Sequence, residues 1–316
     1  MRIPTVKTLL ITGAAGGVAT LLRRELAGRY RLRLSDLRPV KPNAPGESFT
    51  KADVASLRDA LRISRGVDAI LHLGAHSVEG DWETILNANI IGGYNLFEAA
   101  RRNGVPRMIF ATSNHAVGFY RRDQTIDHTV YPKPDGRYGV SKIFGESLAS
   151  LYSDKYGMRC FCIRIGNAGP VPIDKRRLSI WISPRDLAQL VTIGIEHPDI
   201  SFEIVYGVSA NTRSWYDNRN AYRLGYRPQD NSEPYAAELL KVHRPGDPRA
   251  ELYQGGAFVV SEEIENPAPL PRKAARKTAG KRGARGATRR AAASKAAVRK
   301  PTAGKATATR RRRAAR

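Results

Sequence analysis

Short apolar runs alternate along the chain with longer segments in which apolar residues recur every three or four positions. Most of the runs are rich in branched aliphatic residues, and all are followed within two positions by Gly, Asp, Asn or Ser, which is typical of strands in a parallel sheet. The longer segments are typical of helices. The runs cover residues 8–11, 31–34, 69–73, 108–111, 160–165 and 202–205, and the helical patterns cover 21–26, 56–64, 82–102, 139–156 and 185–196. This alternation predicts an α/β fold with a doubly wound parallel sheet and helices on both faces.

The first apolar run leads directly into a glycine-rich turn over residues 12–19, Thr-Gly-Ala-Ala-Gly-Gly-Val-Ala. Gly13 and Gly16 allow the backbone to turn tightly and approach a pyrophosphate, and Gly17 stands where free N–H groups at a helix start favour negative charge. The second run ends in Asp36, at about the separation expected for a carboxylate that binds the adenosine ribose hydroxyls. Such a carboxylate repels a 2′-phosphate. The pattern therefore predicts a Rossmann-like site for NAD rather than NADP, with a plain turn and an incidental surface aspartate as the alternative.

A tyrosine and a lysine lie one helical turn apart in the stretch Tyr138-Gly-Val-Ser-Lys142. A phenol is a poor base at neutral pH, and an ammonium on the same helix face favours the phenolate. We therefore expect Lys142 to lower the pKa of Tyr138 and make it a proton acceptor. The same spacing also occurs on solvated helix faces, but here it follows the glycine turn at the separation that a doubly wound domain gives.

Small or polar residues come directly after several expected strands. In a parallel sheet the active site lies beyond the carboxyl ends of the strands, so the fold would gather these residues beside the cofactor. They are Asp53, Gly74, Ser77, Ser113 and Asn167.

The positive charge is concentrated at the C-terminal end. Residues 267–316 hold 18 of the 53 Lys and Arg and none of the 29 Asp and Glu, so residues 1–266 have a net charge of +6 out of a total of +24. The end segment has no aromatic residue and too few large aliphatic residues to form a core. We expect a disordered Lys/Arg/Ala-rich tail over 267–316, after one α/β domain over 1–266.

Two cysteines, Cys160 and Cys162, share one face of an expected strand. Buried, reduced thiols are favoured over a metal or redox pair, because no further Cys completes a ligand set. No metal site is expected. The N-terminus has no pattern typical of a secretory leader and no apolar stretch is long enough to span a membrane, so we expect a cytoplasmic protein.

These residues resemble the extended short-chain dehydrogenase/reductases, which share the glycine turn, the acidic residue after the second strand, the Ser-Tyr-Lys set and an Asn in the long fourth helix, here Asn89. Within this family the chain is similar to the bacterial uronate dehydrogenases over nearly all of residues 6–260. The segments that carry the likeness are 72–79, 89–96, 113–115, 134–142, 164–166, 207–211 and 254–258.

The resemblance implies NAD-dependent oxidation of a hexuronate, such as glucuronate or galacturonate, at C1 to the aldarolactone. Tyr138 would abstract the anomeric hydroxyl proton, Lys142 would also hold the nicotinamide ribose, and Ser113 would hydrogen-bond the reacting oxygen. Asn89 would support a proton path behind Lys142, or else serve as a structural amide. The resemblance also implies cofactor contacts by Asp53 at the adenine ring, Val54 and Leu73.

For the C6 carboxylate of the substrate, Arg176 matches the substrate-clamping arginine of the family, and a guanidinium suits a carboxylate bidentately. The flanking cations leave a solvated basic loop as the alternative. Asn167 stands where the family has a serine that touches the substrate, so we expect an altered epimer preference or weaker binding. The other positions that the resemblance places at the sugar are Ser77, Ser113, Asn114, His115 and Phe258. It further implies a dehydrogenase domain with substrate-binding elements mainly in 167–266, assembled as a homo-oligomer.

Two alternatives stay open. A nucleotide-sugar epimerase or dehydratase uses the same Tyr-Lys pair on tightly held NAD, although only about a hundred residues follow Gly166 before the tail, few for gripping a nucleotide diphosphate. A nucleic-acid-binding or regulatory protein would use the tail, which has the composition of a polyanion-binding extension. We expect an active enzyme whose tail adds weak, sequence-independent affinity for nucleic acid or another polyanion, against a solvated tail without a dedicated partner.

Overall fold

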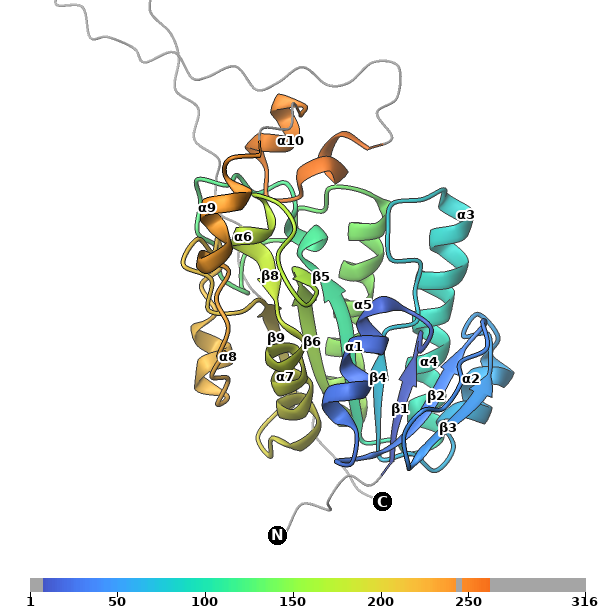
Figure 1. Ribbon diagram of the computed structural model, residues 1–316. Helices are drawn as coiled ribbons and strands as arrows, with labels where there is room; N and C mark the ends of the chain where they lie inside the picture. Colours follow the sequence, from blue (N-terminus) through green and yellow to red (C-terminus); the bar gives the residue numbers. More distant parts are fainter. Residues whose placement is uncertain (1–7, 243–245, 262–316) are drawn as a thin grey trace, which may run out of the picture. The chain divides into compact units, whose positions relative to one another are not determined.

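The computed structural model describes residues 8–242 and 246–261. In this part of the chain the main sheet has seven strands, all parallel, in the order β3-β2-β1-β4-β5-β6-β9 (Figure 1). The strands are β1 (Thr8–Thr12), β2 (Arg31–Asp36), β3 (Glu47–Lys51), β4 (Ala69–His72), β5 (Arg107–Ser113), β6 (Arg159–Ile165) and β9 (Phe202–Gly207). The order reverses between β1 and β4, which creates the crevice where doubly wound sheets bind ligands. The predicted sheet is confirmed.

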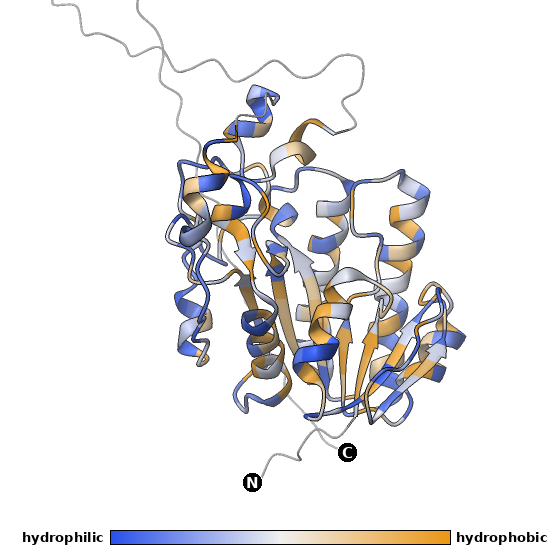
Figure 2. Cartoon of the chain, viewed as in Figure 1, coloured by the Kyte–Doolittle hydropathy of each residue, from blue (hydrophilic) through white to orange (hydrophobic). Residues whose placement is uncertain are grey.

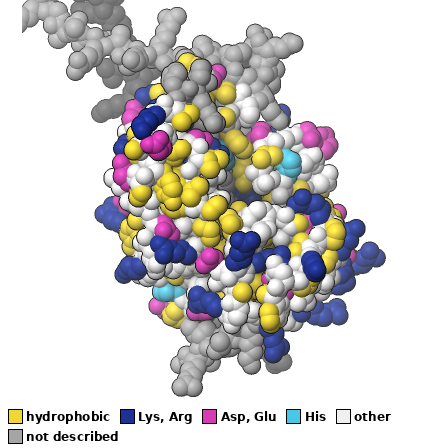
Figure 3. All heavy atoms as spheres, viewed as in Figure 1, with side chains coloured by type: hydrophobic (Ala, Val, Ile, Leu, Met, Phe, Trp, Pro, Cys, Tyr) yellow, Lys and Arg dark blue, Asp and Glu magenta, His cyan; other side chains and the backbone are white. Residues whose placement is uncertain are grey.

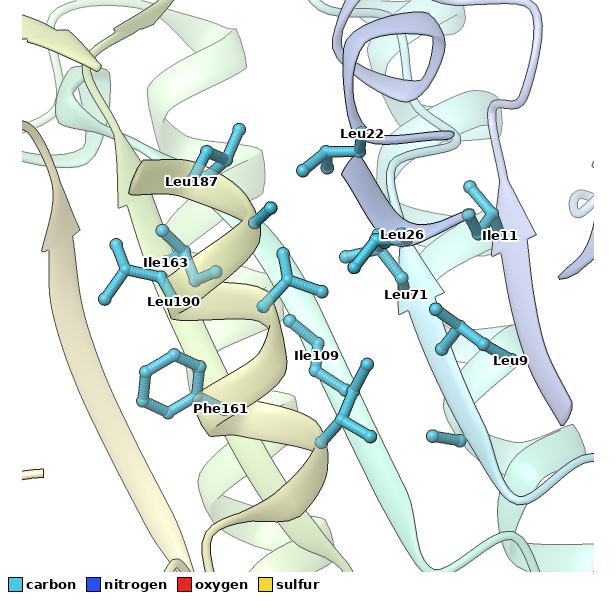
Figure 4. Packing of buried hydrophobic residues seen from close by; sticks show 14 of the residues in the cluster. Leu9, Ile11, Leu22, Leu26, Leu71, Ile109, Phe161, Ile163, Leu187 and Leu190 are labelled. Carbon is cyan, nitrogen blue, oxygen red and sulfur yellow. The ribbon is translucent and has the colours of Figure 1, made fainter. Parts of the chain in front are cut away.

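Helices cover both faces of the sheet. Two pack on one face, α1 (Gly17–Leu26) and α7 (Pro184–Glu196), and three on the other, α2 (Leu57–Ser64), α4 (Gly92–Arg102) and α5 (Arg137–Tyr156). Figure 4 shows leucines of α1 and α7 meeting aliphatic side chains of β1, β5 and β6. The central strands are largely apolar and the polar residues lie on the outer helix faces (Figure 2), because these strands are buried on both sides.

The predicted helix over 82–102 is interrupted. It consists of α3 (Trp82–Ile85), a π-helical turn η1 (Leu86–Ile91) and α4, and Asn89 lies buried in the π-helical turn. A π-helical turn widens the helix locally and is often found at functional sites. Here the Asn89 side chain reaches Ser141 in the first half of α5.

Smaller elements lie beyond the carboxyl edge of the sheet. They are η2 (Asn114–Val117), β7 (Asn167–Ala168), α6 (Arg177–Ile180), β8 (Trp181–Ile182), α8 (Arg219–Arg223), η3 (Glu233–Tyr235), α9 (Ala236–Leu239), α10 (Pro248–Leu252) and η4 (Gly256–Val260). The last described segment docks on the loop after η2: the Gln254 N–H donates to the Tyr120 carbonyl at 2.8 Å and the Gly255 N–H to the Gly118 carbonyl at 2.9 Å.

Cys160 and Cys162 are free thiols packed in the core between the sheet and α5, as expected. Burial raises the pKa of the Cys160 thiol to about 12. Among the described helices, none is long and apolar enough to cross a membrane. The expected tail, 267–316, lies outside the described residues.

Candidate active site

A cleft of about 510 Å³ opens at the carboxyl ends of β1, β2 and β4. It lies at the order reversal of the sheet, and Figure 3 shows a hollow in this face of the molecule. Its lining includes most of the residues that the sequence predicted for the cofactor, together with Ser77 from the substrate set. These are Gly13, Gly16, Gly17, Asp36, Asp53, Val54 and Leu73.

The glycine turn has the geometry that a dinucleotide requires. Gly13 has φ +68°, and a Cβ there would lie 2.6 Å from the Leu73 carbonyl, so both the conformation and the packing exclude other residues. No side chain caps the N-terminus of α1, which leaves its first N–H groups open toward the cleft. Asp36 accepts from the Ala15 N–H at 3.0 Å, which fixes its carboxylate beside the turn. These residues fit NAD.

The three main catalytic candidates lie together at the ends of β5 and α5. Ser113 is the last residue of β5, Tyr138 is in the first turn of α5, and Lys142 is one turn further on; all three are buried. The Lys142 Nζ donates to the Ala111 carbonyl at 2.9 Å and lies 5.3 Å from the centre of the Tyr138 ring. The fold therefore brings together the residues that the sequence placed in one catalytic set.

Contrary to the expectation of an activated base, the net pKa of Tyr138 is not lowered in this structure. Burial raises the pKa of Tyr138 to about 12, and a hydrogen bond with Ser113 acts in the opposite direction. Burial also lowers the pKa of Lys142 to about 8, because the ammonium is removed from water without a carboxylate partner among the described residues. Desolvation therefore dominates the pKa of both groups, an effect that helical spacing alone does not predict.

The first turn of α5 is anchored by Glu79, from the loop after β4. Its carboxylate accepts from the Arg137 N–H at 2.9 Å and from the Tyr138 N–H at 3.2 Å. A carboxylate at this position satisfies free N–H groups and complements the helix dipole. Glu79 thereby fixes the backbone of the candidate base to the loop that carries Ser77.

Arg176 comes just before α6 and is partly buried rather than solvated. Its Nε donates to the Gln254 carbonyl at 2.8 Å, and its Nη2 lies 2.8 Å from the Asn114 side-chain oxygen when that amide is oriented to satisfy its neighbours. Burial lowers the pKa of Arg176 to about 10. Within the described residues it forms no ion pair, whereas the neighbouring Arg177 pairs with Asp174. Arg176 is therefore a cation held by neutral acceptors.

An aromatic stack covers the reactive end of the site. The Phe258 ring from η4 stacks on the His115 ring, with centres 3.8 Å apart, and the Tyr138 and His115 rings meet edge to face. His115 Nδ1 lies 2.7 Å from Asp135 Oδ2. The predicted substrate residues Asn114, His115 and Phe258 thus meet beside Tyr138, although Phe258 is far from the other two in sequence.

Asn89 lies in η1 beside the catalytic pair, whereas Asn167 lies in β7. The Asn89 amide accepts from the His76 N–H at 2.8 Å and donates to the Ser141 hydroxyl at 2.9 Å, which joins η1 to α5 directly beside the catalytic pair. Asn167 lies in β7, opposite Trp181 of β8 and just beyond the end of β6. Their roles in catalysis and substrate binding stay predictions.

Sequence reasoning missed three residues that hold this site: Glu79, Asp135 and Gln254. All three lie in segments that carry the family resemblance, but the residues next to each of them in the sequence do not indicate which residue it contacts. Glu79 acts on a helix 58 residues away, and Gln254 on an arginine 78 residues away. Only the fold makes these contacts visible.

A parallel nucleotide-binding sheet with a serine, a tyrosine and a lysine at its carboxyl edge defines an NAD-dependent oxidoreductase. The chain belongs to the NAD dependent epimerase/dehydratase family, whose model matches residues 9–197. This membership supports NAD as the cofactor, and relatives that are 42–46% identical over most of the chain confirm the expected class of NAD-dependent dehydrogenase.

Individual relatives are narrower in activity than the family. A uronate dehydrogenase of Pseudomonas putida is 46% identical over 256 residues, which is 80% of this chain and 96% of that protein. A crystal structure of uronate dehydrogenase from Agrobacterium tumefaciens, a mutant complexed with NAD, has a TM-score of 0.77 and 42% identity, over 80% of this chain and 97% of that one. A glucuronic acid dehydrogenase from Chromohalobacter salexigens has a TM-score of 0.78 and 43% identity, over 81% and 97% of the two chains.

Proposed function

We propose that the chain oxidises a cyclic hexuronate, such as glucuronate or galacturonate, at C1 to the aldarolactone with NAD⁺. The observation that carries the proposal is Arg176, a partly buried guanidinium without an ion-pair partner among the described residues, held beside Asn114 at the reactive end of the site. A desolvated cation of this kind favours an anionic ligand. The relatives named as uronate dehydrogenases support a sugar carboxylate as that anion.

Each of the candidate catalytic residues has a separate role in the proposed reaction. Ser113 holds the reacting oxygen, and Tyr138 takes the anomeric hydroxyl proton as the C1–H bond breaks. Lys142 holds its ammonium beside the phenol ring, where positive charge favours the phenolate. The glycine turn and Asp36 would hold NAD⁺, which would supply the acceptor for the hydride. The aromatic stack of Phe258 on His115 lies beside the Tyr138 ring at this end of the site.

The Arg176 side chain explains how the uronate would be oriented. A guanidinium can bind a carboxylate with two parallel hydrogen bonds, which fixes both the distance and the rotation of the sugar ring. Asn114 and Gln254 hold the guanidinium from the protein side through neutral acceptors, so the positive charge is left for the substrate.

The test is a steady-state screen of NADH formation with free uronates, neutral hexoses and UDP-sugars, using NAD⁺ and NADP⁺. We expect turnover with uronates and NAD⁺. Arg176→Gln should raise the KM for the uronate by about 30-fold or more, because a charge-assisted contact is lost, and leave the KM for NAD⁺ unchanged. Arg177→Gln is the matched control, since that arginine pairs with Asp174, and Tyr138→Phe is the inactive control. No turnover of any uronate would refute the proposal.

The nucleotide-sugar epimerase or dehydratase alternative rests on the broader family alone. It would require a site for a nucleotide diphosphate beside the sugar, whereas the described substrate region ends in the short turn η4. Turnover of UDP-sugars without NADH release in the same screen would favour it.

Four further features stay predictions. The tail over 267–316 is proposed to add weak, sequence-independent affinity for nucleic acid or another polyanion, supported by its 18 Lys and Arg and the lack of Asp and Glu. A homo-oligomer and a cytoplasmic location are expected from the sequence. The effect of Asn167 on epimer preference is open to the same substrate screen.

A further inference from the structure

Asp135 is a buried carboxylate to which the mechanism above assigns no role. Its side chain is 0% exposed, and it lies three positions before Tyr138. Its Oδ2 is 2.7 Å from His115 Nδ1, and its backbone N–H donates to the His115 carbonyl at 3.3 Å. One residue therefore holds both the backbone and the ring of His115.

The packing allows the Asp135 carboxylate one orientation. Gly118 and Gly255 approach it so closely that a Cβ on either would overlap Oδ2. Its other oxygen, Oδ1, has no hydrogen-bond partner within the described residues. The only hydrogen bond that this side chain makes in the described structure is thus the one to the imidazole, and a buried carboxylate left without it would be costly.

This contact determines which ring nitrogen of His115 carries the proton. An ionised carboxylate only accepts hydrogen bonds, so the bond at 2.7 Å requires a proton on Nδ1. Burial lowers the pKa of His115, which favours a neutral ring at pH 7. A neutral ring protonated on Nδ1 has a lone pair on Nε2, and Nε2 has no hydrogen-bond partner among the described residues.

We propose that Asp135 is a positioning residue: it fixes His115 as the Nδ1–H tautomer, so that Nε2 accepts a hydrogen bond from a hydroxyl of the bound sugar. The identity of the sugar rests on the proposed function. The tautomer of His115 does not depend on that function, because the contact with Asp135 selects it. The pair makes this part of the pocket selective for a hydroxyl donor, because a sugar lacking that hydroxyl leaves Nε2 without a donor in the complex. Phe258, stacked on the imidazole, holds the plane of the ring.

The first measurement needs no substrate. In the ¹⁵N-labelled full chain, histidine ring spectra at pH 7 are recorded, and the His115 signals are assigned by their loss in His115→Phe, which keeps a flat ring against Phe258. We expect the Nδ1–H tautomer. An Nε2–H ring, or a doubly protonated ring, would overturn the proposal.

The second measurement is a double-mutant cycle on uronate turnover. Asp135→Asn keeps the shape but removes the charge that selects the tautomer; we expect it to raise the KM for the uronate at least about 10-fold and to leave the KM for NAD⁺ unchanged. In the His115→Phe background the same substitution should change the KM less than about twofold. An equal effect in both backgrounds, or none in either, would overturn the proposal. If no uronate is turned over, the proposed function fails, while the tautomer measurement still decides the role of Asp135.

Discussion

At the scale of single residues, burial governs the chemistry of this site more than the proximity of charges. Tyr138 and Lys142 are side by side, yet the pKa of each moves in the direction that disfavours its charged form. Lys142 therefore carries its charge at a cost in stability, as is common for catalytic groups.

The cost makes the stability of the chain depend on pH in a defined direction. Between the pKa of about 8 in the folded chain and the ordinary value of 10.5, Lys142 is neutral when folded and protonated when unfolded. The unfolded state then binds more protons, so this group makes the free energy of unfolding rise with pH in that window. We expect wild type to gain on the order of 2–3 kcal/mol relative to Lys142→Met from about pH 8 to about pH 10. Urea unfolding of both proteins at the two pH values measures the gain, and a constant difference would contradict it.

At the scale of elements, the cofactor cleft depends on the contact between the turn after β1 and the end of β4. Gly13→Ala should destabilise the chain by more than about 2 kcal/mol and weaken NAD binding, because the added Cβ meets the Leu73 carbonyl in addition to the strain of a positive φ. Gly28→Ala is the matched control: Gly28 also has a positive φ, of +77°, but nothing lies within 4 Å of its Cβ position. Urea unfolding and NAD titration compare the two variants. An equal loss of unfolding free energy in both would show that backbone strain alone accounts for the effect at Gly13.

The elements that could be predicted from the sequence are those whose pattern is local. The runs at 69–73 and 160–165 form β4 and β6 because strands buried on both faces are continuously apolar, and the glycine turn carries its own signature. The π-helical turn at Asn89 could not be predicted, because its residues have an ordinary helical pattern. The anchoring of Tyr138 by Glu79 and of Arg176 by Gln254 could not be predicted either, since each depends on chain segments that meet only in the folded molecule.

At the scale of the whole molecule, the net charge divides into a nearly balanced domain and a strongly basic end. We expect a 1–266 truncation to keep the uronate kcat and KM of the full chain, because every described site residue lies before residue 262. The full chain should be retained on DNA at low salt and released steeply as salt rises, whereas the truncation should not be retained. Equal retention of both across a salt series would remove the tail from any role in polyanion binding.

The aromatic stack of Phe258 on His115 has a consequence for the order in which the enzyme is completed during synthesis. The residues that line the nucleotide cleft all precede Gly92, so that half of the machinery leaves the ribosome early. The ring that closes the sugar pocket, and the carbonyl that holds Arg176, are among the last parts of the domain to emerge. A chain that ends before residue 254 therefore contains the residues that line the cofactor cleft but lacks both the Phe258 ring and the carbonyl that holds Arg176.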